Sequence, residues 1–311
     1  MADRKIHARG ALVGVLVGDS IGATVEGDSP AAVRDRWRTP AAAAGVTPGP
    51  YSAVSEMTAS LAESLAGDPQ FDGEDFARRL VARASPRRGY GEGTQRAIDL
   101  LKAGGAWDEA SAMFPGRGCY GNGAAARAVP VGLFGSDIDW LRWLAEEQAV
   151  VTHAHALAAE GAVVIAIATA LLIETAGQPI DPQRFLESLA KECHLRELRD
   201  RIAGAADLAR KPFDSVKVLA RLGNNATALG SVATAVYCFV ASPEDFVGVV
   251  GTAFQMGGNA TSIAAMAGGL AGAYLGIEEI PENWVRGLER GDVTVASLSA
   301  AADKIIDAGP R

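Results

Sequence analysis

Three neutral polar side chains, Asn259, Thr261 and Ser262, follow a glycine pair and open a segment made almost entirely of small residues, GGNATSIAAMAGGLAGAYLG. Side chains two residues apart on a loop can converge on one ligand, and hard cations at such spacing usually bind carboxylates. This loop contains no carboxylate. It can therefore orient a ligand through hydrogen bonds, but it offers no anionic oxygen.

Carboxylates occur instead in a glycine-spaced segment near the start of the chain, GVLVGDSIGATVEG. The glycines at 14, 18 and 22 lie four residues apart, so on a helix they share one face and permit close packing against a neighbour. Asp19 and Glu26 lie where such a helix would bring carboxylates to a cleft. For Asp19 the alternative is a solvated helix end.

A second polar cluster, Ser52, Ser55 and Glu56, precedes the amphipathic pattern in PYSAVSEMTASLAESL. These residue types suit a ligand site. A serine just before a helix, with a glutamate in the first turn, is also an ordinary N-cap arrangement. Both interpretations of this cluster remain open at this point.

A glycine-rich loop, GRGCYGNG at 116–123, leads into an Ala-rich segment that predicts a helix. Backbone N–H groups at a helix start can face an anion such as a phosphate. No histidine or aspartate within the loop would activate Cys119 as a nucleophile, so we interpret it as a ligand contact. The candidate ligand-binding residues of the loop are Gly118, Cys119, Tyr120, Gly121, Asn122 and Gly123.

His153 and His155 lie two residues apart near another predicted helix start, THAHALAAEGA. No cysteine or carboxylate lies at metal-ligand spacing from them, which argues against a zinc site. We interpret His155 as a helix-surface or core histidine.

Charge and composition exclude several classes of partner. The net charge of −8 provides no basic surface for nucleic acid or for an anionic membrane. The apolar run at 161–173 is short for a membrane span and suits a buried core helix. Three widely spaced cysteines indicate reduced thiols. Because no secretion signal is recognisable at the start, we expect a cytoplasmic protein.

Hydrophobic periodicity predicts the fold class. Ala-rich segments with 3.6-type spacing recur along the chain, whereas alternating β-branched runs are nearly absent, so we expect an all-α protein of about a dozen or more helices. The breaks at 39–50, 85–93 and 114–123 are too short for flexible linkers, which predicts a single compact domain over 1–311. We interpret the glycine-rich breaks as site loops. The predicted helices cover 11–17, 55–66, 74–84, 94–103, 138–149, 157–174, 183–191, 195–208, 229–240, 243–254 and 262–274.

Taken together and in this order, the segments resemble the ADP-ribosylglycohydrolase family, which includes dinitrogenase reductase-activating glycohydrolases. The family consists of all-α enzymes that cleave ADP-ribose from modified side chains or related acceptors. Most of the chain takes part in the resemblance. It rests on GDSIGATVEG, TASLAESL, YGNGAAARAVPVGL, THAHALAAEGA, AGGLAGAYLG after the double glycine, and IPENW at 280–284.

The resemblance implies a metal site that this sequence has lost. Family members hold two magnesium ions between a Thr-Asp-Asp-Thr patch and an Asp-x-Asp-Thr/Ser patch, and the ions position ribose hydroxyls and the attacking water. The matching residues here are 52–55, Ser-Ala-Val-Ser, and 259–262, Asn-Ala-Thr-Ser. Mg²⁺ generally needs carboxylates, and two neighbouring cations repel each other without negative charge around them. We therefore expect no magnesium pair and no other cofactor.

The resemblance also implies roles for the residues that do match. Glu26 falls on a glutamate beside the metal site and is our first candidate for a catalytic carboxylate. Glu56 is the second, because it follows Ser55 directly and can face the space that the metals would occupy. The glycine loop matches the loop that follows phosphates and ribose, and His153 matches a histidine that approaches the ligand. Hydrogen bonds to ribose hydroxyls are assigned to Ser52, Ser55, Asn259, Thr261 and Ser262.

Two functions are consistent with this pattern. The first is a metal-independent glycosidic hydrolase that acts on an ADP-ribosyl, NAD-derived or related nucleotide-linked substrate, including small metabolites. The alternative is a catalytically inactive family member that binds ADP-ribose or a related nucleotide. In a third interpretation, the loops only stabilise the fold. The expected partner is a small-molecule ligand, and the sequence is compatible with a monomer or a homodimer.

Overall fold

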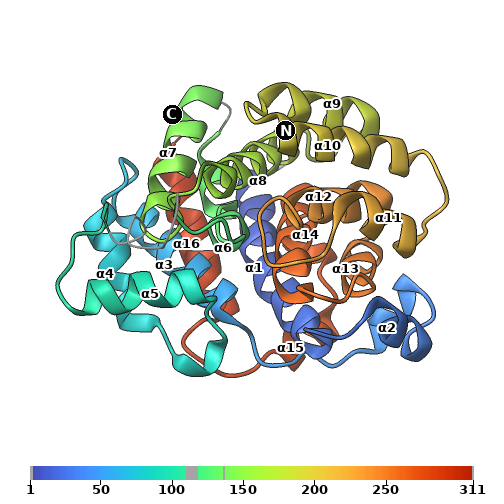
Figure 1. Ribbon diagram of the computed structural model, residues 1–311, viewed down its shortest axis with the longest axis horizontal. Coiled ribbons are helices and arrows are strands. Elements are labelled where there is room, and N and C mark those ends of the chain that lie inside the picture. Colours follow the sequence, from blue (N-terminus) through green and yellow to red (C-terminus); the bar gives the residue numbers. More distant parts are fainter. Residues whose placement is uncertain (1–2, 110–117, 136, 310–311) are drawn as a thin grey trace.

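The computed structural model of the protein describes residues 3–109, 118–135 and 137–309. Within these ranges the chain forms sixteen α-helices, α1–α16, with short 3₁₀ turns and no extended strand (Figure 1). The prediction of an all-α fold is confirmed.

Two long helices lie side by side at the centre of the molecule, α1 (Arg4–Gly22) and α14 (Ala260–Leu275) (Figure 1). Gly18 of α1 faces the backbone carbonyl of Ala264 in α14, and a Cβ atom at position 18 would overlap that carbonyl. The glycine spacing therefore has the packing role predicted for it. Close contact between these two backbones brings the loop after α1 next to the loop before α14.

The remaining helices surround this pair on two sides (Figure 1). On one side, helices pack on α14 or lie outside those that do: α8 (Ala156–Glu174), α9 (Pro182–Glu192), α10 (Arg196–Ala209), α11 (Ser215–Leu222), α12 (Val232–Ala241) and α13 (Phe246–Phe254). The other side is formed by α3 (Ala53–Gly67), α4 (Gly73–Arg83), α5 (Glu92–Lys102) and α16 (Val295–Asp307). The other helices are α2 (Pro30–Arg36), α6 (Gly123–Ala126), α7 (Ile138–Val150) and α15 (Glu282–Gly287).

Buried side chains from these layers form one continuous cluster, which extends from Ala8 to Ile305. The segments Arg4–Val25 and Ala156–Glu174 are long and apolar enough to cross a membrane, and most of each is buried inside the protein. Helix α8 packs against α6, α7 and α14. Contact with neighbours on several sides accounts for a helix that is apolar all round.

Local capping signals explain several helix starts. Asp181 caps α9, which matches the predicted helix at 183–191, by accepting hydrogen bonds from the backbone N–H groups of Gln183 and Arg184. The sequence predicts a helix over 243–254, but α13 begins at Phe246. The backbone N–H of Asp245 donates to the Ser242 carbonyl at 3.0 Å, so the intervening residues form a turn before the helix.

Candidate active site

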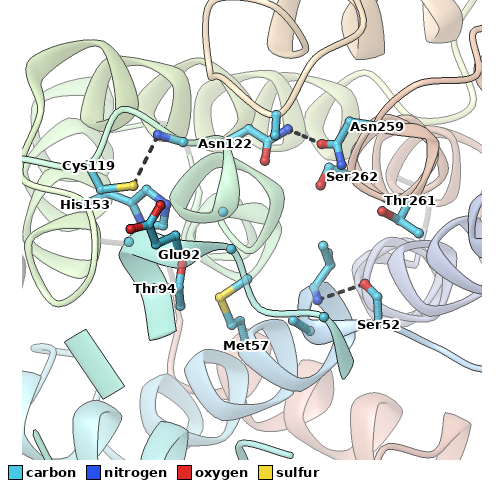
Figure 2. A pocket seen from close by; sticks show the side chains of 18 of the residues that line it. Ser52, Met57, Glu92, Thr94, Cys119, Asn122, His153, Asn259, Thr261 and Ser262 are labelled. Atoms are coloured by element: carbon cyan, nitrogen blue, oxygen red, sulfur yellow. Dashed lines mark hydrogen bonds between the residues drawn. The ribbon is translucent and has the colours of Figure 1, made fainter. Parts of the chain in front are cut away.

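A cavity of about 540 Å³ lies where the loops around the central helix pair meet (Figure 2). This volume suits a small-molecule ligand. Three predicted site residues, Ser55, Glu56 and Gly118, are described by the structure but do not line the cavity. The predicted residues that do line it are Glu26, Ser52, Cys119, Tyr120, Gly121, Asn122, Gly123, His153, Asn259, Thr261 and Ser262.

Glu26 is held at the cavity wall by the start of α14. It follows the 3₁₀ turn Ala23–Val25 at the end of α1. One carboxylate oxygen accepts from Asn259 Nδ2 at 2.8 Å, and the other accepts from the backbone N–H and the hydroxyl of Thr261 at 2.8 and 2.9 Å. Negative charge is favourable at a helix N-terminus. The sequence thus places an oriented, exposed carboxylate in the cavity.

An amide chain connects Glu26 to the glycine loop. Asn122 Nδ2 donates to Asn259 Oδ1 at 2.7 Å (Figure 2). It also donates to Ser231 Oγ at 3.0 Å. Asn259 therefore accepts a hydrogen bond from the glycine loop and donates one to the Glu26 carboxylate. These hydrogen bonds join three segments that are distant in sequence, around residues 26, 122 and 259, at the cavity.

The Ser52 cluster caps a helix as well as lining the cavity. Ser52 is the N-cap of α3 and accepts from the backbone N–H of Val54 at 3.1 Å. Asp19 is completely buried behind it and accepts from the backbone N–H groups of Ser52 and Ser55 and from the Ser55 hydroxyl, at 2.9, 3.1 and 2.6 Å. Burial raises the pKa of Asp19 to about 6.

These contacts change two expectations. Asp19 is an interior helix cap, not a solvated helix end. The sequence predicts that Ser55 contacts the ligand, but its hydroxyl donates to Asp19 and it does not line the cavity.

Glu56 is buried and does not line the cavity. Its carboxylate accepts from the Tyr90 hydroxyl at 2.7 Å and from the backbone N–H of Ser85 at 3.1 Å, and it lies 3.5 Å from Nε of Arg88. The sequence predicts that Glu56 faces the ligand space. In the structure its carboxylate instead anchors the segment around 85–90. Burial, followed by contact with Glu56, raises the pKa of Tyr90.

The glycine loop at 116–123 is anchored by the segment GNNAT at 223–227, whose sequence is similar to GGNAT at 257–261. Gly121 pairs with Thr227, and the Asn122 backbone N–H donates to the Ala226 carbonyl at 2.9 Å. Cys119 accepts a hydrogen bond from the backbone N–H of Gly121 at 3.4 Å, and burial raises the pKa of its thiol. The thiol form suits a ligand contact and does not suit a nucleophile.

The two histidines have different environments. His155 caps α8 by accepting from the backbone N–H of Leu157 at 3.1 Å, and its ring packs edge-on against Tyr120. His153 is buried, with Nδ1 2.6 Å from the Thr152 hydroxyl. Burial, with a smaller effect of Arg127, lowers the pKa of His153 to about 3. His153 is therefore neutral at physiological pH.

Several lining residues were not predicted. Arg88 and Glu92 lie in the break at 85–93, Thr94 follows it, and Thr227 comes from the loop at 223–227. The glycines of the break at 85–93 indicate a site loop there, but they do not identify which of its side chains face the ligand. Arg88 lies over the Tyr51 ring at 3.6 Å and forms a two-point ion pair with Glu289, which explains how a cation is fixed at the cavity wall.

Comparison with known proteins defines the class of this all-α protein. The family model for ADP-ribosylglycohydrolase matches residues 1–310. The chain is 31% identical to ADP-ribosylhydrolase ARH3 of Mus musculus, covering 93% of this chain and 90% of that protein. It is 26% identical to ADP-ribosyl-[dinitrogen reductase] glycohydrolase of Rhodospirillum rubrum, covering 93% of each.

A solved structure agrees with these relationships. An ADP-ribosylglycohydrolase-related protein complex includes a chain with a TM-score of 0.72 and 25% identity, covering 99% of both chains. The chain belongs to the ADP-ribosylglycohydrolase family and is a hydrolase of that family.

The residues at the two positions of the family's acidic patches do not fit a pair of magnesium ions. The Ser52 oxygen accepts from a backbone N–H, and the Thr261 hydroxyl donates to Glu26. Oxygen ligands with negative charge are what Mg²⁺ requires at such a site. In the described part of the chain, no group of three or more histidine, cysteine, aspartate or glutamate side chains has a metal-binding arrangement. We assign no chemical step to magnesium.

Proposed function

We propose that the protein hydrolyses the glycosidic bond of an ADP-ribosyl or NAD-derived compound without a divalent metal, with Glu26 as the catalytic carboxylate. The observation that carries the proposal is the position of Glu26, whose carboxylate is fixed at the cavity wall by Asn259 and Thr261. The names of the related ADP-ribosylhydrolases support the substrate class.

The carboxylate suits the charge that develops when a ribosyl bond breaks. As the bond from the anomeric carbon to the leaving group breaks, its electron pair departs with the leaving group and the ribose gains oxocarbenium character. The negative charge of Glu26 stabilises that state. Water then forms the new bond to the anomeric carbon and transfers a proton to Glu26, which acts as a general base.

Neutral groups around Glu26 supply orientation. Ser52, Asn259 and Ser262 all line the cavity and offer hydroxyl and amide groups to ribose hydroxyls (Figure 2). Fixed hydrogen bonds position a reacting sugar without changing charge. A leaving group that departs as a neutral molecule, such as the pyridine released from an N-ribosylpyridinium, needs no proton and so suits hydrolysis with Glu26 as the general base.

Replacement of the carboxylate by an amide tests the proposal. Glu26→Gln keeps the size of the side chain and removes its charge and basicity, so we expect kcat for an ADP-ribosyl substrate to fall by about 10²–10⁴-fold. The affinity for ADP-ribose, measured by calorimetry, should change only a few-fold. Glu282→Gln, a matched change at the exposed start of α15, should leave both unchanged.

Two outcomes would contradict the proposal. Wild-type turnover that persists in Glu26→Gln would remove Glu26 from the chemistry. Saturable binding of ADP-ribose, with no turnover of any ADP-ribosyl substrate by the wild-type protein, would favour the alternative of an inactive nucleotide-binding member.

A further inference from the structure

A completely buried guanidinium lies behind the glycine loop. Arg127 Nε donates to the Gln148 side chain at 2.7 Å, Nη2 donates to the Gln148 carbonyl at 2.6 Å, and Nη1 donates to the Thr152 hydroxyl at 2.7 Å. All three acceptors are neutral, and no ion pair with Arg127 occurs in residues 3–109, 118–135 and 137–309. A buried charge without a counter-charge is costly, so a role in the site is a natural reason for it.

The guanidinium determines what the Thr152 hydroxyl does. Arginine can only donate, so Oγ1 of Thr152 must accept from Nη1. Its single hydrogen is then available for Nδ1 of His153, 2.6 Å away. Among the described residues no other acceptor for the Thr152 hydroxyl lies within hydrogen-bond distance. If Nδ1 donated instead, the buried hydroxyl hydrogen would have no acceptor, an arrangement that is disfavoured.

The hydrogen on His153 is therefore on the other ring nitrogen. With Nδ1 as acceptor, a neutral imidazole carries its proton at Nε2. Nε2 has no hydrogen-bond partner among the described residues, although only 2% of the residue is exposed. The ring lines the cavity beside the glycine loop, and a Cβ atom added at Gly121 would lie 3.2 Å from Nε2 (Figure 2).

We propose that Arg127 and Thr152 are positioning residues that hold His153 as its Nε2–H tautomer, so that it donates a neutral hydrogen bond to an acceptor oxygen of the bound substrate. The identity of that substrate rests on the proposed function, whereas the tautomer does not. Burial and the neighbouring guanidinium both keep the ring uncharged. His153 thus remains a donor of fixed direction across the physiological pH range.

Nitrogen-15 NMR of the ligand-free protein tests the tautomer. Two-bond proton–nitrogen correlations distinguish protonated from unprotonated ring nitrogens, and His153→Gln identifies the His153 signals by their loss. In the wild-type protein we expect Nε2 protonated and Nδ1 unprotonated. Thr152→Val, which lacks the hydroxyl, should lose this preference, and Thr152→Ser, which keeps it, should retain it. A wild-type spectrum with His153 protonated at Nδ1 would overturn the proposal, even if Thr152→Val fails to fold.

Calorimetry with ADP-ribose tests the consequence for binding. We expect Thr152→Val to weaken binding about tenfold, the effect of one lost hydrogen bond, and Thr152→Ser to stay within about twofold of wild type. An altered tautomer in Thr152→Val with unchanged affinity would overturn the positioning role. If the wild-type protein shows the Nε2–H tautomer but binds no ADP-ribose, the proposed function fails while the hydrogen-bond relay stands.

Discussion

Glu26 accepts hydrogen bonds from both the backbone N–H and the hydroxyl of Thr261, 2.8 and 2.9 Å away. Thr261 stands in the sequence where the family resemblance implies a metal-binding aspartate. A position expected to supply an anionic ligand instead supplies donors to a neighbouring carboxylate. The Glu26 carboxylate is therefore oriented by the residue at a position where the family pattern has an aspartate.

Removing one of the three hydrogen-bond donors to Glu26 should lower the rate of hydrolysis modestly. Thr261→Val keeps the backbone N–H and loses the hydroxyl, so Glu26 retains two of its three hydrogen bonds. We expect kcat to fall about 5- to 10-fold, in line with about 1 kcal/mol for one hydrogen bond. Thr261→Ser restores the hydroxyl and should recover most of the rate. Equal rates in all three proteins would show that this contact does not orient Glu26.

Adding a carboxylate beside Glu26 should be unfavourable. The Asn259 amide nitrogen lies 2.8 Å from a Glu26 oxygen, so Asn259→Asp brings two like charges together. The repulsion raises the pKa of one member of the pair, so its cost is present above that pKa and disappears as the pH falls below the unfolded value. We expect a loss of about 1–3 kcal/mol in the free energy of unfolding near pH 8, with a smaller loss near pH 5.

Asn259→Ala is the control for that experiment, because it removes the amide without adding charge. Its loss of stability should be the same at both pH values. Urea unfolding curves give both quantities. Matching pH dependence in the two variants would contradict the electrostatic explanation.

Asp19 should make stability depend on pH in the opposite sense to an ordinary salt-bridged carboxylate. Burial raises its pKa to about 6, so between about pH 4 and pH 6 the folded protein holds a proton that the unfolded chain releases. Its contribution to stability is greatest below that range and decreases as the pH rises through it. Asp19→Asn keeps an oxygen for the Ser52 and Ser55 donors and removes the titration.

We therefore expect the stability of Asp19→Asn relative to wild type to rise by up to about 3 kcal/mol between pH 4 and pH 7. Asp207→Asn, on the exposed face of α10, should show little change over the same range. Denaturant unfolding at several pH values measures this difference. A constant offset between Asp19→Asn and wild type would mean that the buried carboxylate does not titrate there.

The contact between α1 and α14 should not tolerate a methyl group. A Cβ atom at Gly18 would overlap the Ala264 carbonyl, whereas one at Gly67, at the end of α3, would meet no atom within 4 Å. Overpacking against backbone costs about 3 kcal/mol or more, so Gly18→Ala should lower the melting temperature substantially. Gly67→Ala should be neutral or slightly stabilising. Similar melting temperatures for the two variants would contradict the packing of the central pair.

The sequence predicts the parts of the site that depend on local pattern. Glycine spacing identifies the helix contact, and the polar loop at 259–262 identifies one wall of the cavity. It fails where the partner of a side chain lies far along the chain. Ser55 donates to Asp19, 36 residues earlier, and Glu56 accepts from Tyr90, 34 residues later, so neither contact leaves a local signal.

Arg127 illustrates the same limit in the core. Its segment predicts a small-residue helix, and nothing in the neighbouring letters indicates a buried cation. Its partners Gln148 and Thr152 are on the next helix and just beyond it, and only the packing of that helix brings them within reach.

The dependence of turnover on divalent metal tests the central claim most directly. Hydrolysis of an ADP-ribosyl substrate is followed for metal-depleted protein with a chelator present and again after magnesium is added, while elemental analysis counts bound ions. We predict equal initial rates and no stoichiometric divalent metal. Turnover that appears only with magnesium, together with two ions bound per chain, would contradict the account.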